Sequence, residues 1–126
     1  MTLRPVLRAA TLAALLGAII VLGTPPAHAA AAPVVMSPMR FAALIHAPRE
    51  IRLRFSEAIV MKSSGVTLTD LAGHEVRVVP VKSHGNDSIQ ARIAAKLPAG
   101  VYRVHWQAVS AIDGAKTSGS YQFTVQ

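Results

Sequence analysis

The chain has 126 residues, a formal net charge of +7 and no cysteine, and 52% of its residues are hydrophobic. This length fits one domain, because a single core typically takes about 100–200 residues. The absence of cysteine excludes a disulfide framework, a cysteine-ligated zinc site and a thiol nucleophile. The positive charge points at first to an acidic partner such as nucleic acid or a membrane surface.

Residues 1–29 have the pattern of a secretory signal peptide. Arg4 and Arg8 give a positively charged start, an apolar run follows at 9–22, and Ala27-His28-Ala29 supplies the small residues of a cleavage site. The apolar run is shorter than the roughly 18–20 residues that span a bilayer, so a retained anchor is the weaker alternative. We expect residues 1–29 to be cleaved, leaving residues 30–126 as an exported domain without a membrane span.

Removal of the leader changes the meaning of the charge. Without Arg4 and Arg8, the 13 basic residues become 11 against 6 acidic ones, a net charge of +5. The remaining charges stand singly, and Arg52 and Arg54 alternate with apolar residues as on the solvent face of a strand. With no basic run and few aromatic residues to stack on bases, we expect no nucleic-acid partner.

After residue 29, apolar and polar residues alternate in short runs, which is typical of β-strands. In chain order, the apolar positions are Val34–Met36, Ile51/Leu53/Phe55, Val66/Leu68, Val76/Val78, Ile89/Ala91/Ile93, Tyr102/Val104/Trp106 and Tyr121/Phe123/Val125. Turn-forming residues separate these runs at 70–73, 83–87, 98–100 and 113–114. We therefore predict an all-β domain, an Ig-like seven-stranded Greek-key β-sandwich with Trp106 in its core. A small closed barrel is the competing architecture.

The sequence motifs of common enzyme classes are missing from the chain. It has no G-x-S-x-G, no H-E-x-x-H, no P-loop and no G-x-G-x-x-G. Serine, histidine and aspartate are present, but no pattern places them together. We therefore expect a protein that is not an enzyme.

The histidines of the exported part are the first candidates for a metal site. They are His46, His74, His84 and His105. No two of them have the i, i+2 or i+4 spacing that places two ligands on one face of a strand or helix. The first three fall in predicted loops, where a solvated side chain is the simpler interpretation. His105 points to the face opposite Trp106, where a surface position is the simpler interpretation.

Methionines and carboxylates are the other candidate ligands. Met36 and Met39 form an M-x-x-M pair, and thioethers are soft ligands suited to Cu(I), although such methionines are more often part of a core. Glu57 follows a predicted strand, and Asp113 lies in the loop after the Trp106 strand. Carboxylates at the ends of strands can bind Cu(II), but their spacing in the sequence does not show that these two meet.

Several segments, in order, resemble the CopC family of periplasmic copper-resistance proteins. Ser37-Pro38 and residues 47–57 are similar to that family's S-x-P … A-P-x-x-I-x-L-x-F-S-E opening, and 64–70 with Gly73 to its second strand and turn. Residues 97–106 resemble L-x-x-G-x-Y-x-V-x-W, and 109–125 resemble the closing V-S-A-D-x-H-x-x-x-G-x-Y-x-F-x-V. The resemblance covers nearly all of residues 30–126 and implies an Ig-like seven-stranded sandwich.

The resemblance also implies a Cu(II) site, from which this sequence departs. The family uses a histidine as first mature residue, a glutamate at F-S-E and a D-x-H pair. Glu57 and Asp113 match the two carboxylates, whereas Ala115 stands in place of the D-x-H histidine and Ala30 is the expected first residue. Cleavage after Ala27 instead would begin the mature chain with His28. Residues 70–90 contain no methionine, unlike the methionine-rich Cu(I) loop of some members.

Two functional hypotheses follow from these observations. The first is a periplasmic, non-catalytic copper-binding protein that buffers or delivers copper, with Cu(II) favoured over Cu(I) and an inner-membrane copper importer as partner. Its copper would be held by Glu57 and Asp113, or at a rebuilt site using His46, His105, Met36 or Met39. The second is a metal-free Ig-like envelope module that kept the fold, lost the copper site and acts through a protein partner.

Overall fold

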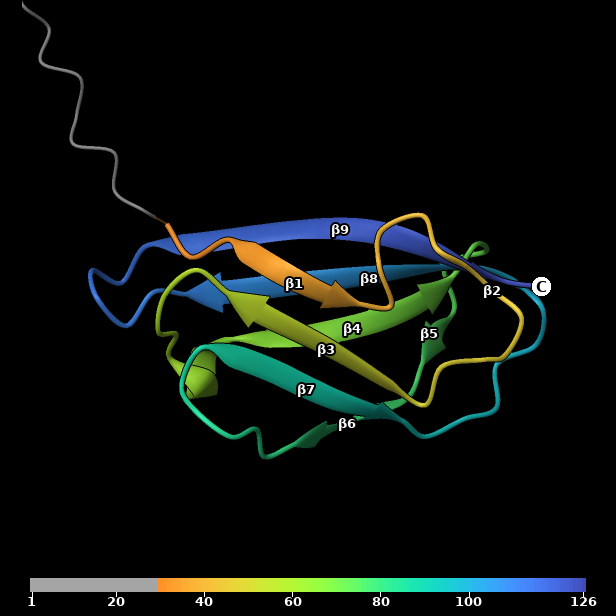
Figure 1. Cartoon of the computed structure of the whole chain (residues 1–126), viewed down its shortest axis with the longest axis horizontal. Coiled ribbons are helices and arrows are strands. Elements are labelled where there is room, and N and C mark those ends of the chain that lie inside the picture. The colour runs from red at the N-terminus through yellow and green to blue at the C-terminus, as the bar shows by residue number, and fades with distance from the viewer. Residues whose placement is uncertain (1–29) are drawn as a thin grey trace, which may run out of the picture.

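The structure, a computed structural model, describes residues 30–126, and the predicted signal peptide lies outside this part of the chain. Two β-sheets pack face to face (Figure 1). Their strand orders are β1-β3-β7-β6 and β2-β9-β8-β4-β5. The predicted all-β sandwich is confirmed, and none of residues 30–126 belongs to a helix long and apolar enough to cross a membrane.

The described chain contains nine strands and one short 3-10 turn. They are β1 Pro33–Ser37, β2 Ala43–Leu44, β3 Glu50–Phe55, the 3-10 turn η1 Met61–Ser63, β4 Gly65–Asp70, β5 Glu75–Val76, β6 Val78–Val81, β7 Ser88–Ile93, β8 Gly100–Val109 and β9 Lys116–Val125. All pairings are antiparallel except that of β2 with β9, which is parallel. The long β8–β9 pair, ten residues on each strand, forms the centre of the five-stranded sheet.

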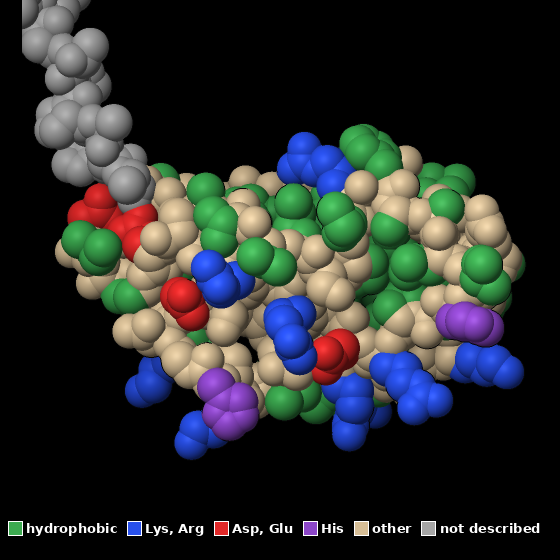
Figure 2. Space-filling model, viewed as in Figure 1, with side chains coloured by type: hydrophobic (Ala, Val, Ile, Leu, Met, Phe, Trp, Pro, Cys, Tyr) green, Lys and Arg blue, Asp and Glu red, His purple; other side chains and the backbone are tan. Residues whose placement is uncertain are grey.

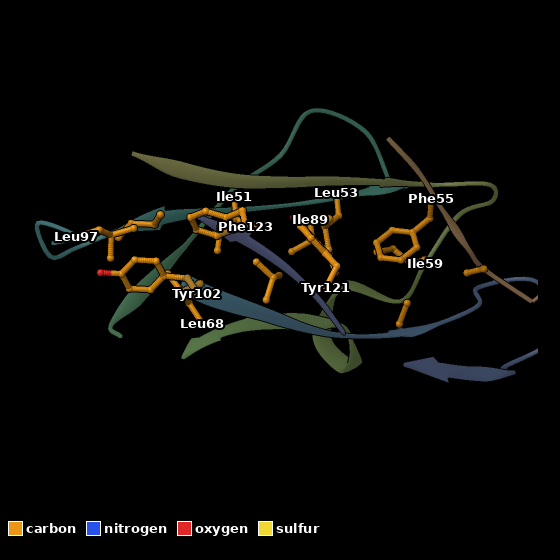
Figure 3. Packing of buried hydrophobic residues seen from close by; sticks show 14 of the residues in the cluster. Ile51, Leu53, Phe55, Ile59, Leu68, Ile89, Leu97, Tyr102, Tyr121 and Phe123 are labelled. Atoms are coloured by element: carbon orange, nitrogen blue, oxygen red, sulfur yellow. The ribbon is translucent and has the colours of Figure 1, made fainter. Parts of the chain in front are cut away.

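The alternation in the sequence becomes the division between core and solvent. In β3, Ile51, Leu53 and Phe55 are buried, while Arg52 and Arg54 are exposed. The buried residues of β7, β8 and β9 meet them between the two sheets (Figure 3). Burial of each large apolar side chain stabilises the fold by about 1.5–3 kcal/mol. Because the chain has no cysteine, non-covalent packing alone joins the two sheets.

The structure differs from the predicted seven strands in two places. The single strand expected around Val76 and Val78 is divided at Arg77: β5 pairs with β4 in one sheet, and β6 pairs with β7 in the other. Val76 and Val78 both still pack against the core. The chain keeps the same face toward the interior as it passes from one sheet to the other. β2 was not predicted, since a two-residue strand carries no measurable period.

Trp106 packs against the core but remains half-buried. Its ring meets that of Phe55 edge-on, with ring centroids 5.6 Å apart. On the neighbouring strand its partner is Gly119, and a Cβ at that glycine would lie 2.7 Å from Trp106 Cζ2. Because Gly119 has no side chain, the indole of Trp106 occupies the space that a Cβ would fill.

We predict that Gly119→Ala lowers the free energy of unfolding by about 1–3 kcal/mol, because the indole must move off its position against Phe55. Urea denaturation followed by tryptophan fluorescence measures the change. Gly65→Ala is the matched control, since a Cβ at Gly65 meets no atom within 4 Å. Equal stability of the two variants would contradict this account of the Trp106 site.

Two buried tyrosines differ in how their hydroxyl groups are satisfied. The Tyr102 hydroxyl donates a 2.6 Å hydrogen bond to the carbonyl oxygen of Pro98. The Tyr121 hydroxyl is buried without a hydrogen-bond partner in the described part of the chain. Burial raises the pKa of Tyr121 to about 12. An unsatisfied buried hydroxyl costs free energy, so Tyr121 is stabilised by its ring and not by its oxygen.

We predict that Tyr121→Phe leaves the free energy of unfolding unchanged or raises it by up to about 1 kcal/mol, whereas Tyr102→Phe lowers it by about 1 kcal/mol. Denaturant titration of both variants tests this contrast. The pH dependence of stability is a second readout. The contribution of Tyr121 to the free energy of unfolding is fully present below about pH 10, where the phenol of the unfolded chain is protonated. This contribution falls as the pH rises toward 12, and the fall is absent from Tyr121→Phe. A Tyr121→Phe variant less stable than Tyr102→Phe would refute this interpretation.

Candidate metal site

Glu57 follows the end of β3, where the chain leaves the four-stranded sheet. Its Oε2 accepts a 2.9 Å hydrogen bond from Ser110 Oγ. Its Oε1 is buried and has no hydrogen-bond partner among the described residues. A buried carboxylate oxygen without a donor is costly, and such an atom is normally paired with a donor or a metal ion. Glu57 Oε1 is therefore available to a cation or to a proton donor.

Ser110 holds the Glu57 carboxylate in place from the opposite sheet. It follows the end of β8 and is 1% exposed, and its Oγ also accepts a 3.1 Å hydrogen bond from the backbone N–H of Ile112. An isolated bridge between Ile59 and Ser110 joins the two segments through the backbone. Ser110 could not be predicted as part of this site, because nothing in a Val-Ser-Ala sequence indicates that the serine faces a carboxylate.

Asp113 lies in the turn that connects β8 with β9. Its Oδ1 accepts a 2.9 Å hydrogen bond from the backbone N–H of Ala115, and Gly114 takes the positive φ of 73° that the turn requires. The N–H of Ala111 donates to the carbonyl oxygen of Ala58, which ties this turn to the segment after Glu57. The structure therefore brings Glu57 and Asp113 to the same end of the sandwich. Figure 2 shows acidic side-chain atoms gathered at the end where the described chain begins.

The start of the described chain is fixed at this same end. Ala32 exchanges two hydrogen bonds with Ser56: its carbonyl oxygen accepts from the Ser56 N–H at 2.8 Å, and its own N–H donates to Ser56 Oγ at 3.1 Å. Thr117 Oγ1 donates a 2.7 Å hydrogen bond to the carbonyl oxygen of Ala31, which is fully buried. Backbone atoms of residues 31 and 32 thus lie against the immediate neighbours of Glu57 on one side and of the 110–115 turn on the other.

The other predicted ligands lie elsewhere. His46 is exposed in the loop before β3, at the opposite end of that strand from Glu57. His105 lies on the outer face of β8, where its Nε2 forms a 3.2 Å hydrogen bond with Thr69 Oγ1. Met36 packs against the core from β1, and Met39 is 71% exposed in the following loop. The structure does not bring these four side chains together, and their role as substitute ligands stays a prediction.

Among the described residues there is no group of three or more histidine, cysteine, aspartate or glutamate side chains that could hold a metal ion. An acidic–histidine pair does occur on the β4–β5 turn, where Asp70 accepts hydrogen bonds from the backbone N–H of His74 at 2.8 Å and from its Nδ1 at 3.2 Å. The backbone hydrogen bond from His74, together with the side-chain contact, lowers the pKa of Asp70. These hydrogen bonds join the two ends of the β4–β5 turn, so the pair has a structural role there.

The fold is a small two-sheet β-sandwich in which Glu57 and Asp113 lie at the end where strands β3 and β8 finish. The CopC domain matches residues 34–126, and the chain belongs to the CopC family. The resemblance inferred from the sequence is thereby confirmed.

Two curated relatives and two solved structures are similar to the chain. Copper resistance protein C from Escherichia coli is 39% identical over 90 residues, 65% of this chain and 71% of that protein. Protein YobA from Escherichia coli K12 is 37% identical over 82 residues, which span 64% of this chain and 65% of YobA. The crystal structure of selenomethionine PcoC, a copper resistance protein from Escherichia coli, has a TM-score of 0.70 at 32% identity and covers 75% of this chain and 99% of PcoC. CopC from Methylosinus trichosporium OB3b gives a TM-score of 0.70 at 24% identity, covering 76% of this chain and 93% of that one, and shows the shared fold.

We predict that Ser110→Ala lowers the free energy of unfolding by about 1–3 kcal/mol, because it leaves the Glu57 carboxylate without its one side-chain donor. Chemical denaturation measures the loss. Ser118→Ala, at an exposed position of β9, is the matched control and changes stability by less than about 0.5 kcal/mol. If the two substitutions cost the same, Ser110 does not support Glu57 in the way described.

Proposed function

We propose that residues 30–126 form a periplasmic, non-catalytic protein that binds copper at the end of the sandwich carrying Glu57 and Asp113. The observation that carries this proposal is the buried Oε1 of Glu57. This oxygen has no hydrogen-bond donor among residues 30–126, whereas Oε2 of the same carboxylate accepts from Ser110. Copper bound there would satisfy that atom. Membership of the CopC family and the similarity to a copper resistance protein support the choice of copper as the ion.

The proposed ligands are oxygen and nitrogen atoms. Glu57 and Asp113 contribute carboxylates, and cleavage after Ala29 would add the free amine of Ala30, one residue before the buried Ala31. Such hard and intermediate donors suit Cu(II) better than Cu(I), which prefers thioether and thiolate sulfur. Because Ala115 replaces an imidazole that the family pattern supplies, we propose a weaker and more readily exchanged site than one containing histidine.

A weak site of this kind suits buffering and delivery of copper. Residues 1–29 are proposed to act as the signal peptide that exports the domain. In the periplasm the domain would take up Cu(II) and pass it on, with an inner-membrane copper importer as the proposed recipient. This role requires reversible binding and no catalytic step.

A titration of the metal-free 30–126 protein with Cu(II), followed by isothermal calorimetry, tests the proposal. We expect one saturable site in the wild type and at least about tenfold weaker binding in Glu57→Gln, because a ligating oxygen is lost. Glu50→Gln is the matched control: its carboxylate is already occupied by Arg52 and Gln90 at the other end of β3, so copper affinity should stay within about twofold.

Absence of saturable Cu(II) binding in the micromolar range would overturn the proposal and favour the metal-free envelope module. The lack of a three-residue ligand cluster in residues 30–126 is the observation that supports this second candidate. Ala115→His in a protein that begins with histidine separates the two. If the wild type does not bind Cu(II) and this variant binds it tightly, the natural chain has lost its site. If the wild type binds measurably and the variant's affinity for Cu(II) is only modestly higher, the copper-binding function is supported.

A further inference from the structure

A basic groove lies at the end of the sandwich remote from Glu57. It has a volume of about 470 Å³ and is formed where the chain enters β3 and where it leaves β7. Its lining contains three cationic side chains and no carboxylate. The lining residues are Ala47, Pro48, Arg49, Arg92, Ile93, Ala94, Ala95, Lys96 and Leu97.

Within residues 30–126, the three cations of this groove form no ion pair. The described ion pairs join Arg52 with Glu50 and His74 with Asp70, and neither pair includes a groove cation. Glu50 lies opposite Arg92 in the β3–β7 register, but its Oε1 accepts from Arg52 Nη2 at 2.9 Å and its Oε2 from Gln90 Nε2 at 2.8 Å. The carboxylate that lies opposite Arg92 is thus engaged by other side chains.

The backbone around the groove is firmly held. The N–H of Ile93 donates a 2.8 Å hydrogen bond to the carbonyl oxygen of Arg49, which joins the two sides. Ile93 at the end of β7 and Leu97 directly after Lys96 are buried in the core. Arg92 lies within β7, and Arg49 immediately precedes β3. The cationic side chains therefore extend from fixed backbone positions, which lowers the entropic cost of binding an anionic ligand.

The groove and the candidate metal site occupy opposite ends of the same strands. Lys96 precedes β8 and Asp113 follows it, and ten residues in a strand span about 34 Å. Figure 2 shows lysine and arginine side chains on the lower right of the visible face, with acidic atoms beside them and further acidic atoms at the upper left. A partner bound at the groove would therefore leave the Glu57 end open.

We propose that the basic groove, residues 47–49 and 92–97, docks an extended acidic segment of a partner protein. Charge complementarity identifies the partner, because three uncompensated cations around a concavity match closely spaced carboxylates, and arginine binds a carboxylate through two parallel N–H groups. The apolar lining consists of small or buried side chains such as Ala47, Ala95 and Leu97. Large apolar side chains protruding among the cations would strengthen binding to a bilayer surface, and the exposed large apolar residues of the described chain lie outside this lining.

Fluorescence anisotropy with a labelled ten-residue peptide of alternating glutamate and alanine tests the proposal. The groove variant is Arg49→Gln/Arg92→Gln/Lys96→Gln in the 30–126 protein. The matched control, Arg54→Gln/Lys62→Gln/Lys82→Gln, removes the same charge from exposed positions outside the groove. We expect the wild type to bind the peptide, the groove variant to bind it about tenfold more weakly, and the control to stay within about threefold. Circular dichroism verifies that both variants fold.

Three outcomes would overturn the proposal. One is no binding of the peptide at low ionic strength, and another is equal loss in the groove and control variants, which would assign binding to net charge alone. The third is tighter binding to vesicles containing phosphatidylglycerol with the same dependence on the groove cations, which would identify a lipid surface as the partner. Copper titration of the groove variant keeps this test separate from the proposed function, because Glu57 and Asp113 are unchanged.

Discussion

The packing of two sheets against one shared core, with no disulfide between them, is the constraint on which the rest of the molecule depends. Ile51, Leu53 and Phe55 of β3 face the buried residues of β8 and β9, so β3 cannot slide without exposing all three side chains. A shift of one residue would move every apolar side chain of that strand to the solvent face. The register of β3 therefore fixes both of its ends, with Arg49 before its first residue and Glu57 after its last.

The candidate metal site is a consequence of that register. Glu57 follows the end of β3 in one sheet, and Ser110 follows the end of β8 in the other. The hydrogen bond between their side chains joins the two sheets at this end of the sandwich. The other carboxylate oxygen, Oε1, is buried and has no hydrogen-bond partner within residues 30–126, which is a local cost in free energy. The proposed copper site of this chain thus consists of carboxylates, while Ala115 stands where the family pattern places an imidazole.

The charge distribution also follows from strand ends. In the sequence the basic residues stand singly, and the net charge alone identifies no partner. In the fold, Arg49, Arg92 and Lys96 meet at one groove because their segments pair or pack together, while the carboxylates of Glu57 and Asp113 collect at the other end. Opposite charges at opposite ends give the domain two separate surfaces, one suited to a cation and one to an anionic partner.

The sequence by itself determined the β-sandwich and the strands that build its core. Alternation of apolar and polar residues is a local property, so the strands containing Phe55, Tyr102 and Phe123 could be predicted from the order of residues alone. The family could be identified for the same reason, since its motifs are short segments in order. Only the tertiary structure decided which residues meet across the sheets. The division of one predicted strand at Arg77, the bond from Ser110 to Glu57 and the gathering of single cations into a groove all depend on contacts between residues distant in the sequence, for which no local periodicity exists.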